Sequence, residues 1–200
     1  MTRKSSAYTI SITGILAALI ILQAYIPMVG YIRITPLWPA ISTIHLTVIL
    51  AGVLLGVRGG AGLGAFWGCV SLIKAYTDAT DPVTILLFRN PLIAIIPRIM
   101  VGVVAGLIFN HMAKTHQKDL LGTIKMVFAG VCGALTNTSL VIALTWVFFA
   151  NNANAVVKGA DGSNLGWLLI GALAINAIAE ALLAGILVPI LSQALLRFKR

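Results

Sequence analysis

Long apolar runs recur from one end of this chain to the other, and most polar residues gather between them. The first run extends from Ser11 to Pro27 and is interrupted only by Thr13 and Gln23, and a late run from Ala177 to Leu196 carries one charge, Glu180. A helix that crosses a bilayer needs about 20 residues and satisfies its own backbone hydrogen bonds there. The pattern therefore predicts an all-α integral membrane bundle of roughly six transmembrane helices.

The predicted helices cover residues 7–29, 43–57, 59–77, 91–112, 120–150 and 166–196, in a single domain over residues 1–200. The second helix is short, so we expect it to be tilted or partly interfacial. Two prolines exclude a regular helix from Gly30 to Ser42 and favour a structured loop, and Pro82 and Pro91 bracket a later connection in the same way. The polar segment from Asn151 to Asn164 predicts a solvated loop.

Composition excludes a water-soluble protein. The chain is 60% hydrophobic and 10% charged, with a mean hydropathy of +1.02, and no soluble fold hides so much apolar surface. There is no room for a nucleotide-hydrolysing domain, no glycine-rich phosphate loop, and no pattern that predicts a metal or a cofactor. Cys69 and Cys132 lie in apolar helices and are interpreted as small buried packing residues.

The basic residues give an orientation. The net charge of +9 comes from clusters at the ends of apolar runs, which is typical of membrane topology rather than of nucleic-acid binding. With six spans both termini share one side. That side carries Arg3, Lys4, Arg58, Lys114, Lys118, Lys125, Arg197, Lys199 and Arg200, whereas the other carries only Arg33, Lys74, Arg89 and Lys158. Both termini are therefore predicted to be cytoplasmic.

A few polar residues fall at membrane depth: His45, Arg98, Asn137, Asn176 and Glu180. A charged side chain in hydrocarbon costs at least about 2.5–3.5 kcal/mol, so such residues normally face a partner or a cavity. An Arg98–Glu180 pair that merely fixes the bundle, hydrogen bonds between helices for the two asparagines, and a helix-start role for His45 all remain open. Together, however, these groups favour a site for a small polar solute, with aromatic walls drawn from Trp38, Trp67, Tyr25, Tyr31 and Trp146.

Glycine and alanine residues recur at helical spacing. Gly60, Gly64 and Gly68 fall at i, i+4 and i+8, which predicts a flat face for close helix contact rather than a dinucleotide site, since no strand precedes them. Gly14 and Ala18 give the first helix a similar face. That face serves either ordinary packing inside the bundle or contact with another membrane subunit.

Several short motifs, in order, resemble one known family. They are Gly14-x-x-x-Ala18, Ile26-Pro27, Gly30-Tyr31, His45, Leu55 to Ala61, Ser71 to Ala75, Asn90-Pro91, Ile96-Pro97-Arg98, Gly133 to Thr138, Asn176 and Glu180. The chain is similar over nearly its whole length to the substrate-binding S components of energy-coupling factor (ECF) vitamin transporters. Glycine stands at position 14 where the family usually has alanine, which keeps the face flat.

The resemblance implies a plasma-membrane subunit of six helices that binds a vitamin from outside and has no ATPase or other catalytic site of its own. It implies as partners one coupling transmembrane subunit and two cytoplasmic ATPase subunits. Gly14 and Ala18 would form the docking face, and the loop from Gly30 to Ser42 would cap the substrate. The whole subunit is expected to topple in the membrane to release its substrate inward.

Pantothenate-specific members look most similar, through the Gly30-Tyr31 loop, His45 and the stretch from Thr136 to Thr138. The predicted substrate-binding residues are His45, Arg98, Asn137, Asn176, Glu180, Tyr31, Trp67 and Asn90. Arg98 would hold the carboxylate, although Arg33 or Arg89 remains possible as that cation. Riboflavin is the alternative vitamin, and a stand-alone secondary transporter is the alternative class. An enzyme would need a nucleophile–base pair or a metal cluster at depth, which the sequence does not offer.

Overall fold

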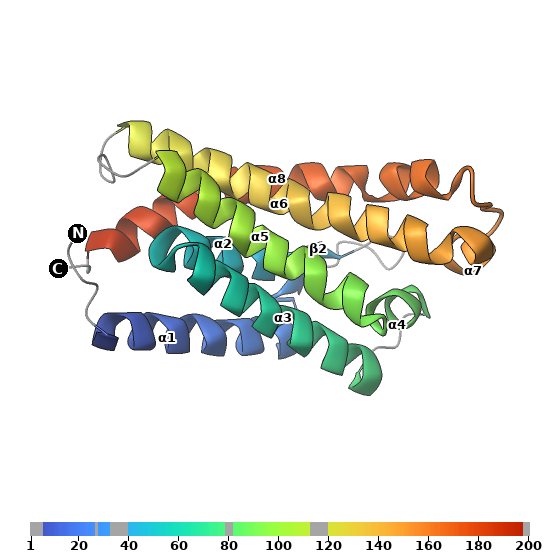
Figure 1. Ribbon diagram of the computed structural model, residues 1–200, viewed down its shortest axis with the longest axis horizontal. Coiled ribbons are helices and arrows are strands. Elements are labelled where there is room, and N and C mark those ends of the chain that lie inside the picture. The colour runs from blue at the N-terminus through green and yellow to red at the C-terminus, as the bar shows by residue number, and fades with distance from the viewer. Residues whose placement is uncertain (1–5, 27, 33–39, 79–81, 113–119, 198–200) are drawn as a thin grey trace.

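A computed structural model describes residues 6–26, 28–32, 40–78, 82–112 and 120–197. These residues form an elongated all-α bundle, as predicted, with its long helices aligned along the longest axis (Figure 1). The main helices are α1 (Ser6–Tyr25), α2 (Ile44–Leu55), α3 (Val57–Thr77), α5 (Pro91–Met112), α6 (Leu120–Phe149) and α8 (Leu165–Arg197). α1 begins and α8 ends at the same end of the bundle.

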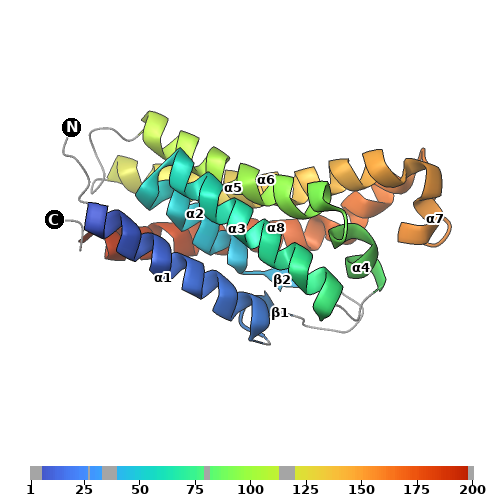
Figure 2. The same ribbon diagram turned by 60° about the horizontal axis from the view of Figure 1, so that its bottom comes forward.

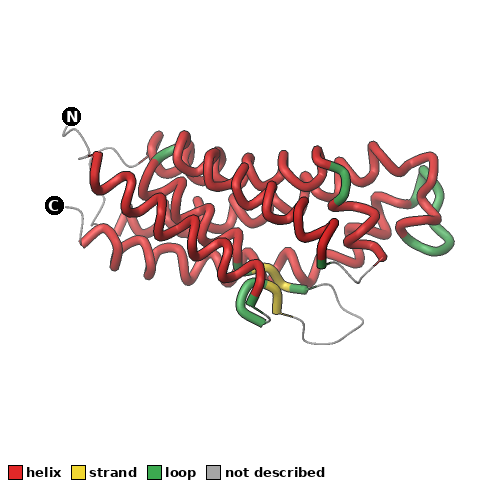
Figure 3. Tube along the Cα trace, turned by 90° about the horizontal axis from the view of Figure 1, so that it is seen from below, coloured by secondary structure: helices red, strands yellow, loops and turns green. Residues whose placement is uncertain are grey.

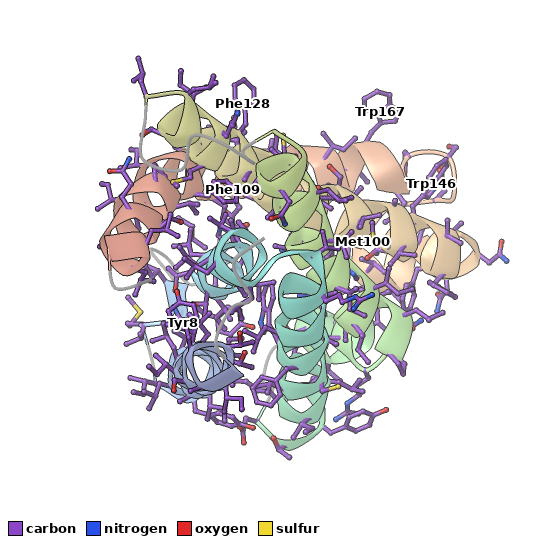
Figure 4. All side chains as sticks on the ribbon, turned by 60° about the vertical axis from the view of Figure 1, so that its left-hand side comes forward. Tyr8, Met100, Phe109, Phe128, Trp146 and Trp167 are labelled. Carbon is purple, nitrogen blue, oxygen red and sulfur yellow. The ribbon has the colours of Figure 1, made fainter. Side chains whose placement is uncertain are left out.

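Four of these helices, α1, α5, α6 and α8, are long and apolar enough to cross a membrane. Large apolar side chains cover the outside of the bundle, and Figure 4 shows Phe128 of α6 and Trp167 of α8 pointing away from it. Such a surface is expected where lipid, not water, is the solvent.

The short helix α2 lies in the centre of the bundle, where it packs against α1, α3, α5, α6 and α8 (Figure 2). Every residue from Ile44 to Leu54 is buried. The prediction of a short second helix is confirmed, and the other helices enclose it. Gly56, with a φ of 85°, ends α2 and permits the sharp turn into α3.

The glycine face predicted for α3 is confirmed, and it packs against α5. A Cβ atom added at Gly60 would lie 2.5 Å from the carbonyl oxygen of Gly102, and one at Gly64 would lie 2.2 Å from that of Arg98. Gly52 of α2 approaches the same carbonyl of Gly102. Only glycine allows the three backbones to come so close. Cys69, one residue beyond Gly68, points away from this contact and is exposed, so its prediction as a buried packing residue was wrong.

Gly102→Ala is expected to lower the free energy of unfolding by about 1–3 kcal/mol, because the new Cβ atom would lie 2.1 Å from the carbonyl oxygen of Gly60 and force α3 and α5 apart. Gly62→Ala is the matched control, since no atom lies within 4 Å of its Cβ position and alanine favours a helix by about 0.5–1 kcal/mol. Equilibrium unfolding in mixed detergent micelles measures both. Equal stability of Gly102→Ala and the parent protein would contradict the close packing.

The connections are more ordered than the sequence predicted. The loop after α1 contains an antiparallel pair, β1 (Tyr31–Ile32) and β2 (Ile41–Ser42), in which Tyr31 is opposite Ser42 (Figure 3). Pro36 and Pro39 lie outside the described residues. A short helix, α4 (Pro82–Phe88), precedes α5 and was not predicted.

The prediction of a solvated loop from Asn151 to Asn164 was only partly right, since most of these residues are exposed but three are buried. The segment contains part of a 3₁₀ turn, η1 (Ala150–Asn152), and a short helix, α7 (Ala153–Val156). Ala153, Val156 and Ala160 are buried in a second apolar cluster with residues of α4, α5 and α8. Their apolar side chains at a spacing of three to four residues explain the helical turn. Asp161 then accepts hydrogen bonds from the Ser163 hydroxyl and from the backbone of Asn164 and Ser163, which hold the pKa of this carboxyl below its usual value.

Candidate substrate-binding site

Arg98 is the centre of the candidate site. It lies on α5, is only 5% exposed, and its Nη1 donates a hydrogen bond of 3.0 Å to the carbonyl oxygen of Ile93. The local sequence explains this contact. Pro97 has no backbone N–H, so the carbonyl four residues earlier, that of Ile93, has no helical donor, and the side chain of Arg98 supplies one.

Two aromatic rings enclose the guanidinium. The Cζ atom of Arg98 lies 5.1 Å from the ring centroid of Trp67, on α3, and 4.6 Å from that of Phe88, at the end of α4. Cation–π contacts of this kind partly compensate a buried charge. The guanidinium is itself planar, which suits it to bind a planar anion such as a carboxylate.

Glu180 and Asn176 bind the β-strand pair to α8. The Oε1 atom of Glu180 accepts a hydrogen bond of 2.7 Å from the backbone N–H of Ser42, and Nδ2 of Asn176 donates one of 3.2 Å to the carbonyl oxygen of Ala40. Their spacing of four residues places both on one inward face of α8, as predicted, and both are buried. Strand β2 is therefore attached directly to the candidate site.

Arg98 and Glu180 form no direct ion pair in the described part of the chain. Each instead has the partner given above. Glu180 is nevertheless near enough for its charge to act on Arg98. The site thus joins α5, α8 and β2 around one cation and one carboxylate.

Several buried polar atoms in this region have no hydrogen-bond partner within the described protein. They are both ring nitrogens of His45, Nε of Arg98, Nε1 of Trp67, Oδ1 of Asn137, and the hydroxyls of Ser42 and Ser71. His45 is fully buried on α2 and lies beside the backbones of Ser42 and Glu180. Unpaired buried polar groups are costly, and a gathering of them is typical of a site that a polar ligand completes.

The remaining predicted residues differ in position. Tyr31 is half-buried, and its ring faces the ammonium of Lys74. Asn137 is buried on α6, and its Oδ1 has no hydrogen-bond partner in the described protein. Asn90 instead caps the start of α5, since its Oδ1 accepts a hydrogen bond of 3.0 Å from the N–H of Leu92.

The alternative cations do not replace Arg98. Arg89 is exposed, donates to the carbonyl oxygen of Ala75 and lies over the ring of Tyr76, 5.0 Å from its centroid. Arg33 and Trp38 lie outside the described residues. Tyr25 and Trp146, considered as aromatic walls, are both substantially exposed.

Sequence reasoning missed Phe88 and the role of Ser42. Phe88 ends the unpredicted helix α4, and the apolar run Ile85 to Phe88 between two prolines was the available signal. Ser42 contributes its backbone N–H, and a backbone donor leaves no trace in the sequence.

The small residues of α1 face outward. Gly14 and Ala18 are exposed, and a Cβ atom added at Gly14 would meet nothing within 4 Å. The buried face of α1 consists of Leu16, Ile20 and Ala24 instead. Packing inside the bundle, the first of the two roles considered for this face, is therefore excluded for Gly14.

A cavity of about 470 Å³ lies elsewhere, between the outer faces of α6 and α8. It is lined by Val127, Val131, Leu135, Ile178, Ala181, Leu182, Gly185 and Ile186. The lining offers no polar side chain to a solute, so this cavity does not compete with the polar cluster around Arg98 as a binding site for a polar molecule.

A bundle with an apolar exterior and a buried cation among unpaired polar groups defines a membrane protein with an internal polar site. A comparison with family models matches residues 9–192 to the family described as "ECF transporter, substrate-specific component". The chain belongs to this family and is therefore a transporter subunit.

Two curated relatives match the chain almost end to end. The pantothenate transporter PanT of Leuconostoc mesenteroides is 35% identical, with 97% of this chain and 98% of the relative covered. The pantothenic acid transporter PanT of Lactococcus lactis subsp. cremoris is 31% identical, with 96% of this chain and 97% of the relative covered.

Proposed function

We propose that this chain is the high-affinity pantothenate-binding subunit of an ECF transporter in the cell membrane. The names of the two relatives and the chemistry around Arg98 support this specificity. Pantothenate presents one carboxylate, two hydroxyls and an amide. The site offers one enclosed guanidinium with an unpaired N–H, together with unpaired polar atoms of His45 and Asn137.

The single observation that carries the proposal is the enclosure of Arg98. The buried guanidinium contacts two aromatic rings, and its Nε has no partner in the described protein. A carboxylate that reaches this group gains a charge-assisted hydrogen bond away from water. A solute without a carboxylate leaves the cation unpaired, and that difference is the basis of selectivity.

The aromatic arrangement disfavours riboflavin, the alternative vitamin. An isoalloxazine ring requires free aromatic faces for stacking. The rings of Trp67 and Phe88 both face Arg98, and the third aromatic side chain of the site, Tyr31, faces Lys74.

We further propose that six helices, α1, α2, α3, α5, α6 and α8, form the transmembrane bundle with both termini in the cytoplasm. α1 begins and α8 ends at one end of the bundle, and Arg58 and Lys125 follow the starts of α3 and α6 at that same end. The excess of basic residues on this side supports the orientation. The vitamin then enters from outside, past the strands β1 and β2.

Transport itself requires energy from partner subunits, because the chain has no nucleotide-binding loop. The partners proposed are a coupling transmembrane subunit, which docks on the face of α1 that contains Gly14 and Ala18, and two cytoplasmic ATPases. After docking, the subunit topples to open its site inward. The unfilled space outside Gly14 supports this assignment of the docking face.

Isothermal titration of the detergent-purified chain with pantothenate, with riboflavin measured alongside, tests the proposed function directly. Tight binding of pantothenate and none of riboflavin is the expected result. Binding of riboflavin alone would reassign the vitamin, and binding of neither would contradict the specificity. Uptake by liposomes that contain this chain without partners would favour a stand-alone secondary transporter instead.

A further inference from the structure

Lys74 occupies a junction between three elements near the candidate site. It lies in the last turn of α3, half-buried. Its ammonium donates a hydrogen bond to the carbonyl oxygen of Ala24 near the end of α1. The same ammonium lies 5.3 Å from the ring centroid of Tyr25 and 5.6 Å from that of Tyr31. One cation thus contacts α1, α3 and β1.

The chain reverses sharply at this junction. α1 ends at Tyr25, Met28 adopts a φ of 63°, and a Cβ atom at Gly30 would lie 1.9 Å from the carbonyl oxygen of Gln23. The last four carbonyl groups of a helix have no helical donor. Lys74 supplies a donor and a positive charge at the C-terminus of α1, where the helix dipole favours a cation.

From this junction a continuous set of contacts leads into the site. The ring of Tyr31 faces the ammonium of Lys74. Across the strand pair, Tyr31 is opposite Ser42, whose N–H donates to Glu180. The position of β1 over the site therefore depends on what holds Tyr31 and the end of α1 in place.

We propose that Lys74 is a positioning residue that holds the end of α1 and strand β1 closed over the bound vitamin, and so limits the rate at which the vitamin leaves. This inference rests on the proposed function for its ligand. Lys74 acts through Tyr31 and Ala24 rather than on the substrate. Its removal therefore increases the dissociation rate much more than it changes the association rate.

The first test measures release of radiolabelled pantothenate from the purified full chain after dilution into unlabelled ligand. Lys74→Met is expected to release the vitamin about tenfold faster, because it loses a charge-assisted hydrogen bond and two ring contacts. Lys74→Arg keeps a cation over the rings and is expected to restore most of the slow release. Arg89→Met is the matched control, since Arg89 also contacts a carbonyl oxygen and a tyrosine ring, but on the exposed side of α3.

Tyr25→Leu is a second variant that weakens the same contact, and it tests the inference even if Lys74→Met fails to fold. Tyr25 is 47% exposed, and its replacement removes one of the two rings around the ammonium. It is expected to accelerate release by a smaller factor. Release as slow as that of the parent protein in both Lys74→Met and Tyr25→Leu would overturn the inference.

Hydrogen exchange provides a readout that needs no vitamin. The N–H of Thr43 donates to the carbonyl oxygen of Gly30, which joins the start of α2 to the chain reversal. Lys74→Met is expected to accelerate exchange in a peptide covering residues 40–46 of the ligand-free protein, whereas Arg89→Met is not. Unchanged exchange would overturn the role of Lys74, even if the parent protein bound no pantothenate and the proposed function itself had failed.

Discussion

Arg98→Ala is expected to weaken pantothenate binding by about 2–5 kcal/mol, because the substrate carboxylate would lose its buried cation. This corresponds to roughly a 30- to 5,000-fold increase in the dissociation constant. The enclosure of the guanidinium by Trp67 and Phe88 makes the effect large. Titration calorimetry of the purified variant measures it, with thermal unfolding of the ligand-free protein recorded in parallel.

A modified ligand separates loss of the carboxylate contact from general damage to the site. The alcohol analogue of pantothenate, which lacks the carboxylate, is expected to bind the parent protein weakly and to lose little further affinity in Arg98→Ala. This ligand–residue cycle isolates the pairwise contact. Equal losses for both ligands would show that Arg98 supports the fold of the site rather than the carboxylate.

Arg89→Ala is the control for the loss of one positive charge. From the sequence alone, Arg89 was also a candidate for the cation that binds the carboxylate. The structure places it on the exposed side of the bundle, against Tyr76. We expect it to bind pantothenate as the parent protein does. A loss in Arg89→Ala comparable to that in Arg98→Ala would contradict the choice of Arg98.

The helices of the bundle were predictable because lipid imposes one simple rule on the sequence. A long run of apolar residues favours a helix there, so each of the six predicted ranges corresponds to a helix of the bundle. The glycine contact between α3 and α5 was predictable for a similar reason, since small residues four apart indicate close backbone approach. The short helices α4 and α7 were missed because the same prolines and polar residues also occur in loops.

The candidate site was only partly predictable. Charged and amide side chains at membrane depth are conspicuous, so Arg98, Asn176 and Glu180 stand out in the sequence. Their partners do not: the carbonyl oxygens of Ile93 and Ala40, like the N–H of Ser42, are backbone groups that every residue type offers. Phe88 lies on the unpredicted helix α4, and the partners of Lys74 lie where the chain reverses after α1; periodicity predicts neither arrangement. The contacts inside the site could therefore be identified only from the structure.

The two faces of α1 carry different kinds of residue. Its buried face consists of large apolar residues and one alanine, whereas its small residues Gly14 and Ala18 face outward. A glycine in the middle of a helix is unfavourable by about 0.5–1 kcal/mol relative to alanine. No contact within the described protein offsets that cost at Gly14, since nothing lies near its Cβ position. A close approach by another helix, from a partner subunit, provides a physical reason for glycine here.

Gly14→Leu is therefore expected to leave pantothenate binding unchanged and to abolish vitamin uptake. The leucine side chain enters open space in the isolated subunit, so neither the fold nor the site is disturbed. In the complete transporter it separates α1 from the coupling subunit and prevents close helix contact. Uptake of radiolabelled pantothenate by cells that produce all four subunits measures transport, and calorimetry on the purified variant measures binding.

Gly171→Leu is the matched control for this experiment. Gly171 is also an exposed glycine within a long helix, α8, and a Cβ atom there meets nothing within 4 Å. Both substitutions add the same bulk to a lipid-facing surface, so only the location differs. Transport that persists in Gly171→Leu and disappears in Gly14→Leu would place the docking surface on α1. Normal uptake by Gly14→Leu would refute that assignment, and equal loss in both variants would mean that added bulk alone impairs the subunit.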